Sequence, residues 1–373
     1  MDLYEYQGKE LFRRFDIPVS EGRLARTPAE ARDAATELGG EVVVKAQVLT
    51  GGRGKAGGIK LASDPADAER KAAEILGLDI RGHVVERIWI ERASEIASEN
   101  YLSVTLDRGG KRPLFMFTKQ GGVEIEQVAA ENPDALVRLH VDPLAGYDES
   151  IGRELVGDDP QTLAIVEKLY RCFVECDATL CEINPLIVTP DGTVRALDAK
   201  VTIDDSALFR HPDIADWRDS SAADPLEAYA HEKGVAYVKL DGTVGIVCNG
   251  AGLAMSTLDV VVVAGGRAAN FCDLGGAGGS AENVVNVLDV VGRDPQLGSI
   301  LSNVFGGITR CDEIARGILA ALEGSGVSVP IVVRLDGTNA EEGRRILAEA
   351  APANVHVEPT MLSAAERAVE LAR

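Results

Sequence analysis

The spacing of hydrophobic positions predicts that the chain has two parts, which differ in the order of their helices and strands. In the first part, it predicts helices at 4–15, 27–38, 65–76 and 160–176, and strands at 41–48, 59–62, 84–92, 101–106 and 114–118. In the second part, strands predicted near 243–248, 269–273, 299–304, 329–334 and 354–357 alternate with helices near 251–264, 281–292, 311–323, 339–350 and 362–372. Five such strand–helix units with short connections predict a parallel sheet with helices on both faces.

A charged stretch rich in proline and serine separates the two parts and places a domain boundary within 212–240. We therefore expect two α/β domains, at 1–225 and 226–373. The segment 132–159 is polar and predicts a mixture of loop and helix.

One hairpin stands out at the end of the first part, where two β-branched-rich runs flank a Pro-Asp-Gly turn. With the turn centred on Asp191, Asn184 faces Asp198 and Glu182 faces Lys200, with Cβ atoms about 5 Å apart. Amide and carboxylate oxygens at that separation suit a hard cation such as Mg²⁺, with room for phosphate oxygens. The alternative is a solvated hairpin face with an ion pair, and a slip of one residue would break the pairing.

A glycine-rich segment follows the strand predicted at 41–48. Positions 50 to 60 include five glycines and three basic residues, Arg53, Lys55 and Lys60. A second strand follows, so the segment predicts a hairpin lid over phosphates, with Lys45 contributing from the strand; the GxxxxGK[ST] loop is absent. The alternative is a flexible turn that binds nothing.

Composition narrows the possible partners. The 373 residues carry 59 acidic and 38 basic side chains, a net charge of −21, which disfavours nucleic acid and anionic membranes as partners. An anion site must then be a local exception, and the glycine-rich segment is one. Six cysteines without a CxxC pair, no apolar signal core and no run of about 20 apolar residues predict a cytoplasmic, soluble protein.

Three further glycine-rich stretches, 249–253, 275–280 and 303–310, follow predicted strands of the second part. Ligands of parallel sheets bind at the carboxyl ends of strands, and helix N-termini favour anions. The stretches therefore predict an anion or carboxylate site, although such turns also occur without a ligand. In the first part, Glu91 and Glu99 at strand ends could accept hydrogen bonds from a sugar or an adenine amine, or be surface charges.

Several motifs follow one another in order: VKAQV at 44–48, GGRGKAGG at 51–58, GGVEIE at 121–126, EINPL at 182–186, LFR at 208–210, NGAGLAM at 249–255 and NVFGGI at 303–308. Together they resemble the β-subunit family of succinyl-CoA synthetase (succinate–CoA ligase), of the ADP-forming type, over essentially the whole chain. The resemblance implies an ATP-grasp domain followed by a flavodoxin-like, doubly wound CoA-ligase domain.

The resemblance also implies roles for individual residues. For the nucleotide, ATP/ADP with GTP/GDP left open, it implies phosphate contacts from Lys45, Gly52, Arg53 and Gly54, and base and ribose contacts from Glu91, Ser94 and Glu99. It implies Mg²⁺ ligation by Asn184 and Asp198, and succinate binding by Asn249, Gly307, Ile308 and Thr309. The helix starting near Gly250 would direct its N-terminus at a phosphoryl group. Ser256 stands where the family often has glycine.

The family reaction passes phosphate through a phosphohistidine, yet none of the five histidines lies in a glycine-rich active loop. The resemblance implies that an α subunit supplies this histidine and most of the CoA site. We expect Glu182 to orient the visiting imidazole, unless it simply pairs with Lys200.

Three alternatives stay open at this stage. A malate–CoA ligase β subunit would share the nucleotide residues. A stand-alone ATP-grasp carboxylate–amine ligase would need no partner histidine. A non-catalytic assembly module would have lost nucleotide binding, which the presence of Lys45, Arg53, Asn184 and Asp198 argues against.

Overall fold

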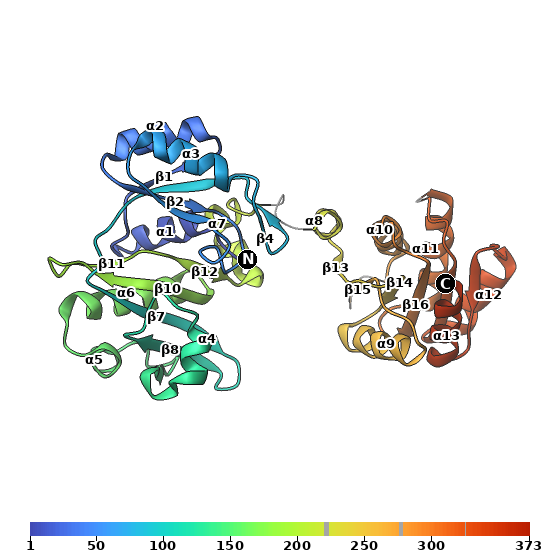
Figure 1. Cartoon of the computed structure of the whole chain (residues 1–373). Coiled ribbons are helices and arrows are strands. Elements are labelled where there is room, and N and C mark those ends of the chain that lie inside the picture. The colour runs from blue at the N-terminus through green and yellow to red at the C-terminus, as the bar shows by residue number, and fades with distance from the viewer. Residues whose placement is uncertain (220–223, 276–278, 325) are drawn as a thin grey trace. The chain divides into compact units, whose positions relative to one another are not determined.

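The computed structural model describes residues 1–219, 224–275, 279–324 and 326–373 (Figure 1). The chain divides into two compact units, Met1–Arg218 and Asp219–Arg373. Among the described residues, no helix is both long enough and apolar enough to cross a membrane.

The first unit contains a four-stranded antiparallel sheet in the order β1-β6-β2-β3. Its strands are β1 (Gly22–Ala25), β6 (Ile88–Arg92), β2 (Val42–Ala46) and β3 (Ile59–Ala62), and helices α2 (Pro28–Leu38) and α3 (Pro65–Ile75) pack on it. Each helix begins with proline, after a Thr27 or Asp64 side chain that accepts a backbone N–H of the first turn. Strands β2 and β3 pair antiparallel, which confirms that the glycine-rich segment closes a hairpin.

A second sheet of the same unit has the order β11-β10-β7-β8-β9, with β12 also paired to β10. Its strands are β7 (Ser98–Asp107), β8 (Arg112–Thr118), β9 (Val137–His140), β10 (Ala178–Val188), β11 (Val194–Ala196) and β12 (Lys200–Ile203). Helices α5 (Glu149–Val156) and α6 (Pro160–Glu175) contribute to its core, while α4 (Ile125–Glu131) follows β8. Helix α1 (Glu5–Arg14) runs between the two sheets (Figure 1).

The register of the 180–200 hairpin is as predicted. Leu186 pairs with Ala196 on one side, and Glu182 pairs with Lys200 on the other. Asn184 and Asp198 lie between these two pairs, where β11 has ended and β12 has not begun. The Pro-Asp-Gly turn fixes this register locally, because Thr189 and Thr193 close it with backbone hydrogen bonds.

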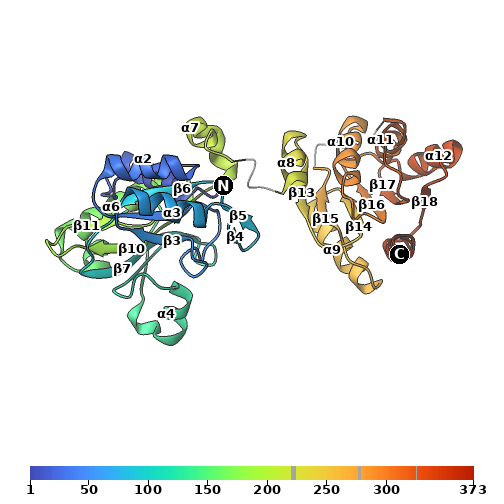
Figure 2. The ribbon, with the colours of Figure 1, turned by 45° about the horizontal axis from the view of Figure 1, so that its top comes forward.

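The second unit is an α/β sheet in the order β13-β15-β14-β16-β17-β18. Strands β14 (Val244–Cys248), β15 (Asn270–Asp273), β16 (Ser299–Gly306), β17 (Ile331–Gly337) and β18 (Val355–Val357) are parallel, as predicted. Helices α10 (Ala281–Gly292), α11 (Cys311–Gly324) and α12 (Ala340–Ala350) pack in one apolar core, and α9 (Ala251–Val263) and α13 (Met361–Leu371) pack in another (Figure 2). The parallel strands follow the flavodoxin-like order, with the switch point between β14 and β16.

The stretch 212–240, where the sequence predicts the domain boundary, also contains regular structure: helices α7 (Pro212–Ala215) and α8 (Pro225–Glu232) and strand β13 (Ala236–Lys239). Strand β13 joins the edge of the second sheet antiparallel to β15. One local expectation was wrong: the strand expected at 84–92 is divided, since His83–Val84 forms a small pair with Asp79–Ile80 and β6 starts only at Ile88.

Candidate nucleotide and carboxylate sites

Lys45, on β2, points into the interior of the first unit and is only 6% exposed. Its ammonium group lies 3.0 Å from a carboxylate oxygen of Glu5, 3.0 Å from one of Glu91 and 2.8 Å from the Leu197 carbonyl oxygen. Burial opposes the charge, but Glu5, Glu91 and Asp198 outweigh it and raise the pKa of Lys45. Lys45 is therefore a fixed, permanently charged cation.

Arg53 links the glycine-rich segment to the 180–200 hairpin. One guanidinium nitrogen lies 2.5 Å from Glu5, and the other lies 2.7 Å from Asp198. Burial works against the charge, yet Asp198 and Glu5 raise the pKa of Arg53. Gly52 has a φ of +85°, a conformation that side chains other than glycine rarely adopt, and the carbonyl groups of Gly52 and Gly54 accept N–H groups within the turn. The turn thereby presents Arg53 toward the hairpin.

Two further charged residues of this site, Glu5 and Lys9 on α1, were not anticipated from the sequence. Lys9 is fully buried and contacts the carboxylates of both Glu5 and Glu91. Three carboxylates (Glu5, Glu91 and Asp198) and three cations (Lys9, Lys45 and Arg53) thus form one charge-balanced network. Glu5 and Lys9 are four residues apart on an N-terminal helix. This spacing does not indicate burial, because charged pairs at this spacing commonly lie on helix surfaces.

The residues expected at the base and ribose lie at and beyond the end of β6. Glu91 is fully buried and accepts a hydrogen bond of 2.9 Å from the Trp89 indole N–H, in addition to its two lysines. Ser94 lies two residues past β6, with its hydroxyl 3.4 Å from that of Ser20. Glu99 is the second residue of β7 in the second sheet, where it pairs with Ile187.

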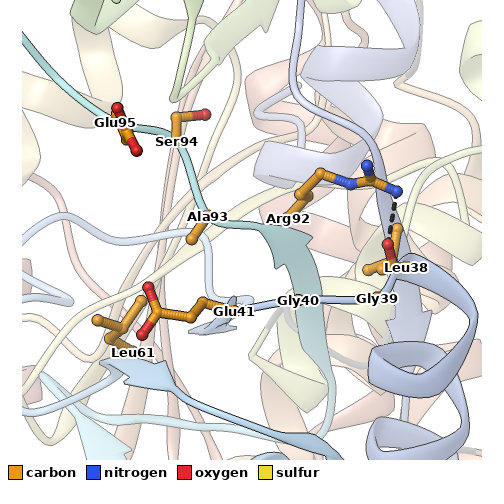
Figure 3. Close-up of a pocket in the computed structure, with 9 residues that line it drawn as sticks. All are labelled: Leu38, Gly39, Gly40, Glu41, Leu61, Arg92, Ala93, Ser94 and Glu95. Carbon is orange, nitrogen blue, oxygen red and sulfur yellow. Dashed lines mark hydrogen bonds between the residues drawn. The ribbon is translucent and has the colours of Figure 1, made fainter.

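Ser94 also lines a cavity of about 600 Å³ (Figure 3). Arg92 closes one side by donating a hydrogen bond of 2.5 Å to the Leu38 carbonyl. The remaining lining comes from the Gly39–Gly40 turn after α2, the following Glu41, Leu61 of β3, and the segment that carries Ala93 and Glu95. The cavity mouth therefore has both carboxylate and guanidinium groups beside an apolar wall.

The two expected metal ligands engage different neighbours. The Asn184 amide accepts the Gly122 N–H at 2.8 Å and donates to the Val123 carbonyl at 2.9 Å. Asp198 pairs with Arg53 and accepts the Ala199 N–H at 2.7 Å. Among the described residues, no cluster of three or more His, Cys, Asp or Glu side chains could hold a metal by itself. The pair nevertheless fits Mg²⁺, which prefers oxygen ligands and commonly combines one or two carboxylates with phosphate oxygens.

Glu182 lies on β10 and is half-buried, with a carboxylate oxygen 3.1 Å from the Tyr101 hydroxyl, which donates a hydrogen bond to it. Burial raises the pKa of Glu182, and the facing Lys200 and the Tyr101 hydroxyl oppose that rise. Lys200 faces Glu182 across the strands, but the ion pairs of the described residues include none between the two. In the described contacts Glu182 thus accepts a hydrogen bond from Tyr101 and pairs with no cation.

In the second unit, Asn249 directly follows β14 and spans the switch point. Its amide donates to the Phe305 carbonyl at 2.7 Å and accepts the Phe305 N–H at 2.8 Å, so it ties the ends of β14 and β16 together. Asp273, at the end of β15, accepts the N–H of Gly250 at 2.6 Å and that of Gly275 at 2.9 Å. Residues 276–278 of the predicted stretch 275–280 lie outside the described residues.

The loop after β16 carries the other residues expected at succinate. Ile308 is 88% exposed at its tip, whereas Thr309 is buried. The Gly307 carbonyl accepts a hydrogen bond of 3.0 Å from the Thr338 hydroxyl. Next to the loop, buried Asp312 pairs with Arg310 at 3.1 Å and accepts from the Asn339 amide at 3.0 Å. The structure thus brings Asn249 and the 307–309 loop to the same edge of the sheet.

Residues 2–188 match the ATP-grasp domain family, and residues 246–372 match the CoA-ligase family. Together with the glycine-rich hairpin over buried cations and the flavodoxin-like unit, these matches define a nucleotide-dependent ligase of the ATP-grasp and CoA-ligase type. The chain belongs to the succinate–CoA ligase [ADP-forming] subunit β family.

Relatives of that name extend over the whole chain. The protein from Rubrobacter xylanophilus is 58% identical over 100% of this chain and 99% of its own length. The protein from Chloroflexus aurantiacus is 50% identical over 100% of this chain and 99% of its own length. Among solved structures, ATP citrate lyase from Methanothrix soehngenii has the same fold, with a TM-score of 0.77 and 20% identity over 99% of both chains.

Proposed function

We propose that this chain is the nucleotide- and succinate-binding β subunit of a succinate–CoA ligase. Together with a partner that carries a phosphohistidine, it would interconvert succinyl-CoA, ADP and phosphate with succinate, CoA and ATP. The observation on which the proposal rests is that Lys45, Arg53 and Asp198 lie in one charged network next to a glycine-rich hairpin, in a chain that belongs to this family. We assign nucleotide binding to residues 1–225 and the succinate site to residues 226–373.

For the nucleotide, the fixed charges of Lys45 and Arg53 and the backbone of Gly52 and Gly54 would bind phosphate oxygens. Phosphoryl transfer needs mainly such positioning and charge neutralisation from a protein. Glu91, Ser94 and Glu99 would contact the base and ribose, and of these three residues Ser94 lines the cavity described above.

Asn184 and Asp198 would hold Mg²⁺, which would supply charge neutralisation on the phosphates. Asp198 would then contact both the metal and Arg53, with which it pairs in the structure, and Glu5 would direct Arg53 toward the phosphates. The Asn184 amide orders the backbone of Gly122 and Val123 next to the same position.

Glu182 would orient the imidazole of the partner's histidine. Its half-buried carboxylate, oriented by Tyr101, suits a cationic or N–H-bearing ring. In the second unit, Asn249, Gly307, Ile308 and Thr309 would bind the carboxylates of succinate, and the partner would supply most of the CoA site. All six cysteines are buried and free, which supports a cytoplasmic location.

The test is co-expression of the chain with its partner subunit, followed by labelling of the partner from ATP or GTP carrying γ-³²P. We expect an acid-labile, base-stable label that requires both subunits and Mg²⁺, and faster turnover with succinate than with malate. Full turnover by the isolated chain, or faster turnover with malate, would contradict the proposal.

A further inference from the structure

Glu5 occupies a position in the nucleotide site that its sequence context does not suggest. Its side chain is 2% exposed and lies between the two cations that we assign to phosphate binding. One carboxylate oxygen contacts Lys45 at 3.0 Å and Lys9 at 2.7 Å, and the other contacts Arg53 at 2.5 Å. The Gln47 amide donates to the second oxygen at 3.3 Å.

Of the two cations assigned to phosphate binding, Lys45 and Arg53, each of the other two carboxylates of the network contacts only one. Glu91 contacts Lys45 and Lys9, and Asp198 contacts Arg53. Glu5 is therefore the carboxylate that contacts both Lys45 on β2 and Arg53 in the glycine-rich segment. Without it, the described contacts of the Arg53 guanidinium would be those with Asp198 and with the Ala46 carbonyl oxygen, at 2.7 Å and 3.1 Å.

The charge of Glu5 is secure in this position. Burial acts against it, but Lys45, Lys9 and Arg53 outweigh burial and hold the pKa of Glu5 well below its ordinary value. Charged hydrogen bonds are about twice as strong as neutral ones and more demanding in geometry. A carboxylate fixed in this way can set the separation of the two cations to which it binds.

We propose that Glu5 is a positioning residue of the nucleotide site, which holds Lys45 and Arg53 at the separation that the nucleotide phosphates require. The inference rests on the proposed function. Helix α1 would then be part of the phosphate site, although Glu5 itself, an anion, would not bind phosphate. Lys9 would hold Glu5 and Glu91 in place from the same helix.

The test uses the two routes by which the complete complex would form its phosphohistidine. ATP would phosphorylate the histidine through the nucleotide site. Succinyl-CoA and inorganic phosphate would phosphorylate it without that site, since phosphate displaces CoA as the free thiol and the resulting acyl phosphate passes its phosphoryl group to the imidazole, releasing succinate. A defect in folding or assembly reduces both routes, whereas a misplaced Lys45 and Arg53 reduce only the first.

We expect Glu5→Gln, in the co-expressed complex, to raise the KM for ATP about tenfold or more, as expected for the loss of charged hydrogen bonds. The rate of labelling from succinyl-CoA and ³²P-phosphate should stay within about twofold of the wild-type rate. Glu10→Gln is the matched control, because Glu10 lies on the same helix, is exposed and pairs only with Arg13 in the described contacts. It should change neither route.

Equal losses in both routes, an unchanged KM for ATP, or tighter ATP binding would each overturn the inference. If Glu5→Gln does not assemble, Glu5→Asp takes its place, because it keeps the charge but shortens the reach to Arg53; the same selective rise in KM is then required. Wild-type complex that is labelled by neither route would instead refute the proposed function.

Discussion

Lys9→Met tests whether the buried network beneath the glycine-rich hairpin is held by charge balance. The substitution keeps an unbranched side chain of similar length but removes a fully buried ammonium group that contacts Glu5 and Glu91. Two cations, Lys45 and Arg53, would then face three carboxylates.

The size of the effect follows from burial. Removing one partner of a buried ion pair leaves an uncompensated charge and costs about 3–5 kcal/mol. For a folding unit of about 200 residues, that loss lowers Tm by about 6–20 °C. The matched control is Lys60→Met, because Lys60 pairs with Glu74 at 2.5 Å on a more exposed surface; we expect a loss of at most about 1 kcal/mol.

The effect should depend on pH with a defined sign. In the wild-type protein the pKa of Glu5 is lowered by Lys45, Lys9 and Arg53 against the effect of burial. A lowered pKa contributes stability that is present above the ordinary value of 4.5 and is lost as the pH falls toward the folded-state pKa. The variant lacks the contribution of Lys9 to this lowering, so its deficit should be largest near pH 7 and should shrink below about pH 4.5.

The assay is urea unfolding followed by intrinsic fluorescence. The chain has two tryptophans, Trp89 and Trp217, and both lie in the first unit, so fluorescence excited selectively at tryptophan reports that unit. A loss below about 1 kcal/mol at pH 7, or a deficit that grows in acid, would refute the charge-balance reasoning.

Three further predictions concern the reaction. Asp198→Asn should raise the Mg²⁺ concentration needed for labelling from ATP by at least about tenfold while the subunits still assemble, and near-normal labelling would remove Asp198 from the metal role. Tyr101→Phe removes a hydroxyl that lowers the pKa of Glu182, so the acid limb of the pH–rate profile for phosphotransfer should move to higher pH, and an unshifted limb would contradict the role of Glu182. Asn249→Ala breaks the pair of hydrogen bonds to Phe305 and should raise the KM for succinate at least about tenfold, with ATP labelling unchanged; equal effects on both would indicate a folding defect instead.

The sequence alone determined the features that local patterns encode. The alternation of strand and helix after residue 243 predicted all five parallel strands of the second unit. This was possible because the spacing of hydrophobic residues and the glycine-rich turns are short-range signals. The hairpin register was predictable for the same reason, since a Pro-Asp-Gly turn sets which residues face one another. The residue types at Lys45, Arg53 and Asp198 also indicated phosphate and metal chemistry before any contact was known.

Only the tertiary structure decided which charges meet. Glu5 and Lys9 have the spacing of an ordinary surface pair, and only the packing of α1 between two sheets buries them against Lys45, Arg53 and Glu91. Likewise, the edge strand β13 forms because its backbone groups hydrogen-bond to β15. The paired residues, such as Tyr237 and Cys272, are more than thirty positions apart in the chain. Burial and pairing over such separations depend on the whole fold, and no local period in the sequence records them.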